Sequence, residues 1–376
     1  MSWLTGLIIY TLFILLISYI IYSKNQVFYK PLEYTNLETL EKVSVHRLYP
    51  EFACLDKNSF FRIFIGFYFY ALPRFIINMF FAVMQIIQLN SNMKKLKNPT
   101  TDPEDWSIIS NIISKWTNLV LKLNSIKVNR ITLNYEEVYK KYLGEDYEFN
   151  PDEKYSLIVS NHTGFYDIIM NMAIHKCGFL SKEETKKYFL VGTISIALNC
   201  LFVKRENKED RERIFLELEK RQKDFYEGKL LTPICLFPEG TTTNGKYILK
   251  FKRGAFYNLL PIKPQIILLG NNLDYSCAIG VGSAAFNYFR SLCYFGCQIN
   301  LCELPVIKPT EYMFEKYKDL GSEKWEIFAE VTRKIMCEIG GLTPSDKTFR
   351  DSKRYENSLY KGVYEEENKD LLETKS

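Results

Sequence analysis

The sequence predicts an α/β fold in which a mostly parallel sheet is covered by helices. An N-terminal transmembrane helix and a membrane-embedded helical hairpin are expected to precede this domain. Two observations indicate this arrangement: two long apolar stretches near the N-terminus, and short apolar runs that alternate with amphipathic patterns from about residue 130. Such alternation favours a parallel sheet with helices on both faces. The predicted parts are a transmembrane helix (1–25), a connector with a second membrane segment (26–100), an α/β domain (130–345) and a polar tail (346–376).

The first apolar stretch covers residues 3–22 and contains no charged residue. Its length matches the hydrocarbon core of a bilayer, which is about 30 Å thick. A cleaved signal peptide is disfavoured, because no basic region precedes the stretch and no small-residue cleavage pattern follows at 23–25. Lys24 and Lys30 follow the stretch, which predicts that the chain after residue 22 faces the cytosol.

The second apolar stretch, at about 60–89, is interrupted by Arg62 and by Pro73 and Arg74 near its middle. It is too long for one ordinary span and has a helix breaker at its centre. We therefore expect a hairpin that dips into one leaflet, with Arg74 reaching the headgroups. A single tilted span is the alternative. The many aromatic residues of the stretch disfavour a buried pair of soluble helices.

The α/β part contains six candidate strands, at 156–159, 188–191, 201–204, 234–237, 265–269 and 298–302. Amphipathic patterns predict helices over 206–227, which Gly228 ends, and over 322–339. The apolar run 284–297 fits either a core helix or a surface helix that touches acyl chains. The polar tail from residue 346 is expected to be a surface extension or partly disordered.

Composition limits the classes of function. The formal net charge of +5 makes no case for nucleic-acid binding. Nine cysteines lack the paired spacing of metal motifs, and only three histidines are present, so no metal site is predicted. The scattered cysteines suggest reduced thiols and a soluble part that faces the cytosol.

His162 and Asp167 form the most informative pair in the chain. They are five positions apart and follow a short apolar run that is typical of a buried strand. If a helix begins near Gly164, the two side chains can fold back toward each other. The carboxylate can then hold the imidazole in one tautomer, and the free ring nitrogen can accept a proton from a hydroxyl group. A surface histidine near a helix N-cap is the alternative interpretation.

A second motif begins at Glu239, after another apolar strand, and continues through Gly240 and Thr241. A turn of this kind can bind a glycerol hydroxyl or phosphate oxygens through backbone N–H groups and threonine hydroxyls. Residues 240–273 contain no acidic residue but five basic ones, which favours an anionic ligand such as phosphate or coenzyme A. An ordinary turn and a solvated basic face are the alternatives.

These motifs together resemble the glycerolipid acyltransferase family over about 150–345. The similarity lies in four ordered blocks: Asn161 and His162 with Asp167, Phe-Val-Lys-Arg at 202–205, Phe-Pro-Glu-Gly-Thr at 237–241, and Pro-Ile-Lys-Pro at 261–264. The segment 237–256 resembles, in particular, the lysophosphatidylcholine and lysophosphatidylethanolamine acyltransferases.

The resemblance implies transfer of a fatty acyl group from acyl-CoA to the free hydroxyl of a lysophospholipid at a bilayer, without a cofactor. It implies that His162 is the general base and Asp167 its partner, and that 130–345 is the acyltransferase domain. The implied substrate-binding residues are Lys204, Arg205 for the acceptor phosphate, Glu239, Gly240 and Thr241 for the glycerol and phosphate portion of the acceptor, and Pro264 on the acyl-CoA side.

Several alternatives remain open. Many lysophosphatidic acid enzymes have Arg where this chain has Thr242, which favours a choline or ethanolamine lysolipid because a phosphate monoester suits a bidentate Arg. Lysophosphatidic acid or glycerol-3-phosphate acylation and a CoA-independent transacylase are the enzymatic alternatives. A non-catalytic membrane protein that binds lipid is the alternative of another class. The expected location is the endoplasmic reticulum membrane, with the catalytic domain facing the cytosol.

Overall fold

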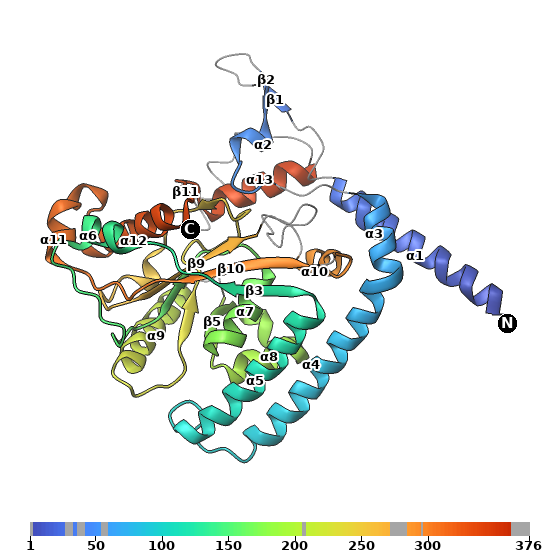
Figure 1. The fold of residues 1–376 in the computed structure, drawn as a ribbon, viewed down its shortest axis with the longest axis horizontal. Helices are drawn as coiled ribbons and strands as arrows, with labels where there is room; N and C mark the ends of the chain where they lie inside the picture. The colour runs from blue at the N-terminus through green and yellow to red at the C-terminus, as the bar shows by residue number, and fades with distance from the viewer. Residues whose placement is uncertain are drawn as a thin grey trace.

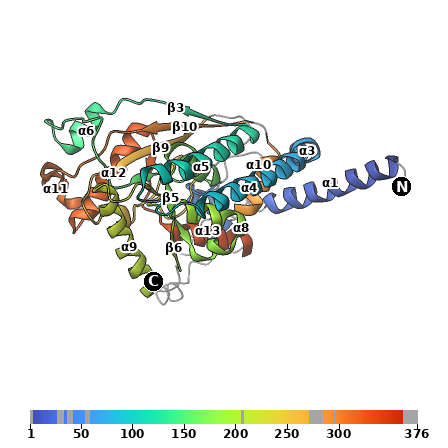
Figure 2. The ribbon, with the colours of Figure 1, turned by 90° about the horizontal axis from the view of Figure 1, so that it is seen from below.

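The fold is known from a computed structural model, which describes residues 3–26, 33–35, 42–53, 59–204, 208–270, 284–294 and 296–361. Two views show a sheet enclosed by helices and an N-terminal helix that projects away from this body (Figure 1, Figure 2).

The central sheet has seven strands in the order β3-β10-β9-β4-β7-β5-β6. All neighbouring strands are parallel except β9 and β10, so the predicted mostly parallel sheet is confirmed. In sheet order, the strands are Ile126–Arg130 (β3), Cys297–Glu303 (β10), Lys263–Leu269 (β9), Ile158–Ser160 (β4), Ile234–Leu236 (β7), Gly178–Lys182 (β5) and Leu201–Val203 (β6).

Successive side chains of the central strands enter different cores. Val159 and Leu236 belong to one cluster, whereas Ile158 and Cys235 belong to another, as the two-residue period of a strand requires. Both faces are therefore covered, as predicted. One face packs against α6 (Glu136–Leu143), α9 (Lys208–Tyr226), α11 (Glu311–Lys316) and α12 (Lys324–Gly340), and the other against α5 (Pro103–Leu123), α7 (Phe165–His175), α8 (Phe189–Ala197) and α10 (Ala284–Leu292).

The two apolar stretches form the two helices that are long and apolar enough to be candidate membrane spans among the described residues. The first is α1 (Trp3–Asn25). The second runs without a break through α3 (Phe60–Gly66), a π-helical turn η2 (Phe67–Ala71) and α4 (Leu72–Met93).

The predicted hairpin at Pro73 is therefore wrong. A proline inside a helix leaves a carbonyl group of the preceding turn without its donor. Here the wider π-helical turn at Phe67–Ala71 directly precedes Pro73 and accommodates this defect, so the helix continues. The helix folds back only after residue 93, where a short connection leads to α5, which packs beside α4 (Figure 1, Figure 2).

Arg74 also differs from the prediction, because its guanidinium group is buried instead of reaching headgroups. It donates to the carbonyl groups of Leu292 and Tyr294 at 3.2 and 2.7 Å, and to the Ser125 hydroxyl at 3.3 Å. The arginine thus fastens the start of α4 to the end of α10 and to the loop before β3.

Further polar contacts fasten α4 and its exit to the domain. The Asn78 and Asn124 amides bond to each other in both directions, and the Trp116 indole donates to Gln88 at 2.8 Å. Beyond the helix, Leu231 N donates to the carbonyl of residue 100 at 2.9 Å. Because both ends of α4 are attached to one domain, α4 runs along this domain instead of leading away from it.

The predicted polar tail instead begins with α13 (Phe349–Lys361). Tyr355 of this helix is fully buried, and its hydroxyl lies 2.9 Å from His46 Nδ1 in α2 (Val45–Leu48). The tail folds because this apolar side chain finds a partner near the N-terminus; residues 362–376 lie outside the described residues. The small sheets pair Glu33–Thr35 (β1) with Lys42–Ser44 (β2), and Tyr247–Ile248 (β8) with Thr343–Pro344 (β11).

Two further predictions need correction. Residues 189–191 belong to helix α8, with Tyr188 at its N-cap, and not to a strand, because a short apolar run fits either structure. The expectation of reduced thiols fails at Cys297, which is disulfide-bonded, although six other described cysteines are free and buried. The run 284–297 begins as α10 and continues into β10, and Leu292 and Tyr294 are buried in the core.

Candidate active site

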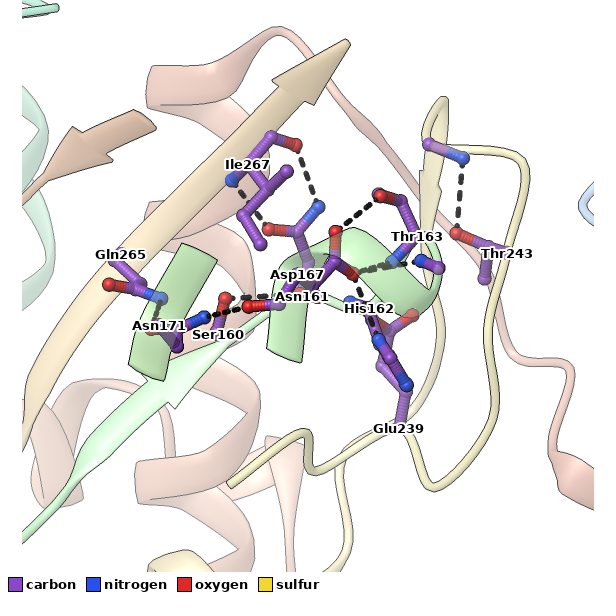
Figure 3. Close-up of polar contacts among 12 residues, drawn as sticks. Ser160, Asn161, His162, Thr163, Asp167, Asn171, Glu239, Thr243, Gln265 and Ile267 are labelled. Atoms are coloured by element: carbon purple, nitrogen blue, oxygen red, sulfur yellow. Dashed lines mark hydrogen bonds and ion pairs between the residues drawn. The ribbon is translucent and has the colours of Figure 1, made fainter. Parts of the chain in front are cut away.

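The site lies at the carboxyl ends of two adjacent parallel strands, β4 and β7. The register pairs Val159 with Leu236, so His162 and Glu239 each follow this pair by three residues. Carboxyl ends of parallel strands share one edge of a sheet, where ligands commonly bind in open α/β folds. The two sequence motifs are thereby brought together, although they are 77 positions apart (Figure 3).

His162 and Asp167 are in direct contact. The Nδ1 atom of His162 lies 2.9 Å from Asp167 Oδ2, and the Asp167 side chain is almost fully buried. A carboxylate only accepts hydrogen bonds, so Nδ1 carries the proton in this arrangement. The imidazole is therefore held with Nε2 free to accept a proton, and the His162 side chain keeps 17% of its surface exposed.

Asp167 is held by further donors at the start of α7 (Figure 3). Oδ2 accepts from the backbone N–H groups of Thr163 and Gly164 at 2.5 and 2.9 Å, and Oδ1 accepts from the Thr163 hydroxyl at 2.8 Å. Because both oxygens are engaged, the carboxylate cannot turn away from the imidazole. Thr163 was not singled out from the sequence; its position between the histidine and the aspartate was the available signal.

Glu239 is placed differently from the prediction that it binds substrate. Its side chain is buried, Oε1 accepts from His162 N at 2.8 Å, and Oε2 accepts from Leu249 N at 2.8 Å. Burial raises the pKa of Glu239 to about 8, and the two backbone donors act in the opposite direction. Since both oxygens bind backbone, Glu239 holds the His162 loop against the following segment.

The turn after Glu239 packs against both the catalytic loop and α13. Gly240 has φ +71°, a conformation that favours glycine. Thr241 Oγ1 lies 3.3 Å from Ser352 Oγ of α13, and Thr243 N donates to the His162 carbonyl at 2.9 Å. The turn is therefore positioned by the C-terminal helix, a contact that the sequence did not predict.

The basic residues that follow this turn have different environments. Lys252 lies against the turn, since any side chain at Gly240 would collide with its ammonium group. Lys263 forms an ion pair with Glu303 at 3.1 Å, and the Arg253 guanidinium lies over an aromatic ring of α9. From the sequence, all five basic residues of 240–273 were equal candidates for binding an anion. The structure places one of them, Lys252, next to the turn that follows Glu239.

The His162 ring stacks on Phe237, with the ring centres 4.0 Å apart and the planes at 14°. Phe237 in turn stacks on Phe179 of β5, with the planes at 4°. One face of the His162 imidazole is thereby covered by an apolar ring, which further restricts its orientation.

The remaining predicted site residues that the structure describes, Lys204 and Pro264, lie apart from this cluster. Lys204 is exposed at the end of β6, which is three strands from β4, or roughly 14 Å along the sheet edge. Arg205 lies outside the described residues. Pro264 is buried within β9, paired with Val159, and its carbonyl accepts from Leu304 N. Pro264 thus shapes the sheet beneath the site.

A buried polar network supports the site from below (Figure 3). The Asn161 amide bonds to both backbone groups of Ile267 in β9, at 2.9 and 2.7 Å. Asn171 donates to the Asp167 carbonyl and accepts from Gln265, both at 2.8 Å. These contacts fix the end of β4 and the first turns of α7 to the neighbouring strand.

The other two histidines, His46 and His175, have contacts of their own. His175 Nε2 lies 2.9 Å from the oxygen of Gln265, and burial lowers the pKa of His175. Among the residues that the structure describes, no cluster of three or more His, Cys, Asp or Glu side chains could hold a metal ion.

Residues 141–268 match the protein family described as Acyltransferase. The chain is 33% identical over 208 residues to the lysophospholipid acyltransferase LPEAT1 of Arabidopsis thaliana, covering 55% of this chain and 50% of that protein. It is 28% identical to human lysophosphatidylcholine acyltransferase 1, covering 54% and 36%. The chain thus spans half or less of the length of these relatives.

A solved structure from Thermotoga maritima, the 1-acyl-sn-glycerophosphate acyltransferase PlsC, aligns with a TM-score of 0.45 and 15% identity, covering 72% of this chain and 96% of that one. The family match covers the segment that contains β4, α7 and β7, with His162, Asp167 and Glu239. Residues 141–268, which hold both motifs, are thus similar to the acyltransferase family.

Proposed function

We propose that this protein transfers a fatty acyl group from acyl-CoA to the free hydroxyl of a lysophospholipid, with His162 as the general base. The observation that carries this proposal is the His162–Asp167 contact, which leaves Nε2 free in a loop of fixed conformation. The family match over the same residues supports acyl transfer as the reaction.

In the proposed reaction, the lysolipid hydroxyl oxygen attacks the thioester carbonyl carbon while His162 Nε2 takes the hydroxyl proton. The resulting imidazolium is stabilised by the Asp167 carboxylate at Nδ1. The tetrahedral intermediate then collapses, the carbon–sulfur bond breaks, and the imidazolium returns the proton to the leaving thiolate of coenzyme A. The ester product and free thiol balance the equation without a covalent acyl-enzyme.

Glu239 has a positioning role in this proposal and does not bind the glycerol group. Its carboxyl group fixes the backbone of His162, while Gly240, Thr241 and Lys252 line the turn beside it. Lys252 is the cation nearest to this turn that we assign to the acceptor phosphate. Arg205 and Lys204 remain candidates for the same phosphate, and Pro264 for the acyl-CoA side.

The acceptor that we propose is a lysophosphatidylcholine or lysophosphatidylethanolamine. Thr242 and the activities for which the similar proteins are named support this choice. Lysophosphatidic acid and glycerol-3-phosphate are the alternative acceptors. We further propose that α1 anchors the protein in the endoplasmic reticulum membrane, with the catalytic domain on the cytosolic side.

The test is an activity matrix with the full chain purified in detergent. Release of free coenzyme A thiol is measured with acyl-CoA and, separately, each of the four acceptors. The proposal predicts thiol release that depends on acceptor and is fastest with a choline or ethanolamine lysolipid. Binding of lysolipid with no thiol release for any acceptor would contradict catalysis and favour a lipid-binding protein; a phospholipid donor in place of acyl-CoA detects a transacylase.

A further inference from the structure

Helix α8 presents large apolar side chains to the surface. Tyr188, Phe189, Val191 and Ile196 are 63%, 68%, 51% and 51% exposed, and we call these four residues the α8 surface. The sequence contains no charged residue from 188 to 203. Single exposed apolar residues are ordinary, but a cluster of large ones marks an interaction site.

Helix α4, against which α8 packs, exposes an apolar face of its own. The two helices pack against each other, and Leu89 of α4 shares a core cluster with Ala197 and Leu198 of α8. The exposed face of α4 consists of Ile76, Ile77, Phe80, Val83, Met84 and Ile87.

The orientation of α4 determines what can cover this face. Arg74 fastens one end of α4 to the domain, and the carbonyl of residue 100 accepts from Leu231 N just beyond the other end. Helix α5 runs beside α4 and exposes polar side chains, including Lys115 and Lys122. A helix attached in this way cannot cross a bilayer without carrying polar surface through it. Its apolar face can instead lie in the plane of one leaflet.

We propose that the α8 surface binds a lipid bilayer and lies in the same leaflet as the outer face of α4. Tyr188 is a residue type that is enriched at the membrane–water interface, Phe189 is typical of the apolar face of interfacial helices, and Lys187 directly precedes them. The occupant is lipid rather than a protein, because α8 packs against an apolar helix that is long enough to be a candidate membrane segment.

This contact lies close to the proposed chemistry. Phe179 of β5 stacks on Phe237, which stacks on His162, and β5 leads through a short 3₁₀ turn, Glu183–Lys187, into α8. Docking of α8 would therefore bring the lipid surface beside the strand that supports the catalytic ring. The purpose of this contact rests on the proposed function, whereas its detection does not require activity.

The experiment places a polarity-sensitive fluorophore on Val191→Cys and, separately, on Ile196→Cys in the full chain. The matched control is Leu216→Cys on α9, an exposed leucine (62%) on the helix layer that covers the other face of the sheet. Labelled wild type reports the signal from native cysteines. Each protein is mixed with vesicles of phosphatidylcholine and phosphatidylserine, with and without lipids that carry a quencher near the headgroup.

We expect a blue shift and lipid-dependent quenching at positions 191 and 196, and neither at position 216. Labels at 191 and 196 that behave like the label at 216 on vesicle-bound protein would overturn the proposal. If the labels enter the bilayer but no acceptor supports thiol release, the surface assignment stands and the proposed function fails.

Discussion

Two regions differ in how their side chains are covered: the carboxyl ends of β4 and β7, and the outer face of α4 and α8. At the strand edge, Asp167 and Glu239 are almost completely buried, and all of their carboxyl oxygens bond to neighbouring groups. On the helix face, large apolar side chains such as Phe80 and Phe189 are exposed. The first region is preorganised by its own hydrogen bonds, whereas the part of the chain that the structure describes leaves the second exposed.

This difference predicts different responses to substitution. Changes at the strand edge should reduce turnover and folding stability together, because each buried polar group there is both a support and an orienting contact. Changes on the helix face should leave the fold intact and should alter only the association of the protein with a membrane.

The largest effect is expected for Asp167→Asn. The amide nitrogen cannot accept from the donors that meet the carboxylate, and the imidazolium loses its counter-charge. We expect turnover to fall about 10²–10⁴-fold, the usual range for general acid–base catalysis, when thiol release is measured with saturating lysolipid.

The matched control is Asp351→Asn in α13, because Asp351 also accepts from the backbone N–H and the hydroxyl of a threonine, Thr348. This variant loses similar hydrogen bonds away from the catalytic pair and should retain turnover. Equal losses in the two variants would show that the effect of Asp167 is structural.

Glu239→Gln should lower the free energy of unfolding by about 1–3 kcal/mol at neutral pH, because one of two backbone N–H donors loses its acceptor. Turnover should fall with it, since one of these donors belongs to His162. Urea denaturation and thiol release on the same samples measure both effects.

The pH dependence sharpens this prediction. A carboxyl group whose pKa is raised from 4.5 to about 8 keeps its proton in the folded state after the unfolded chain has lost it. The stability that Glu239 contributes should therefore fall as pH rises from 4.5 to 8, by at most about 1.4 kcal/mol per pH unit. Glu239→Gln should lack this slope; parallel slopes for the two proteins would contradict the assignment.

A smaller effect is expected for Thr163→Val, which removes the donor to Asp167 Oδ1 but preserves the side-chain shape. We expect a loss of turnover of about tenfold, which corresponds to about 1.4 kcal/mol, with little change in KM for the lysolipid. Thr163→Ser retains the hydroxyl and should restore most of the turnover. If serine and valine variants behave alike, the hydroxyl does not orient the carboxylate.

The smallest effect on folding is expected on the helix face. Phe80→Ser replaces an exposed side chain and should change the free energy of unfolding in detergent by no more than about 0.5 kcal/mol. Vesicle flotation should nevertheless show weaker membrane association than for wild type. If Phe80→Ser lowered the free energy of unfolding in detergent as much as Glu239→Gln does, this face would be a buried core and not a lipid-facing surface.

The same contrast explains which features the sequence could reveal. The position of the site at the carboxyl ends of β4 and β7 was predictable, because His162 and Glu239 each follow an apolar run and parallel strands bring such positions together. The role of Glu239 was not predictable, because its partners are backbone groups whose positions depend on the folded loops.

The arrangement of α4 also could not be inferred from local patterns. Arg74 bonds to carbonyl groups 218 and 220 positions away, so its burial depends on contacts that no local pattern contains. Helix α8 was mistaken for a strand because its apolar run does not show a decisive period. Which side chains of α8 are exposed depends on how the helices pack on the sheet, and no local sequence pattern contains that information.

The most direct test of the central claim, that His162 removes the proton from the acceptor hydroxyl, is thiol release by wild type and His162→Ala with and without lysolipid. Both proteins should be folded under the assay conditions and bind lysolipid alike. The account predicts acceptor-dependent thiol release for wild type, and release for His162→Ala that lysolipid does not increase. Near-wild-type, acceptor-dependent release by folded His162→Ala would contradict it.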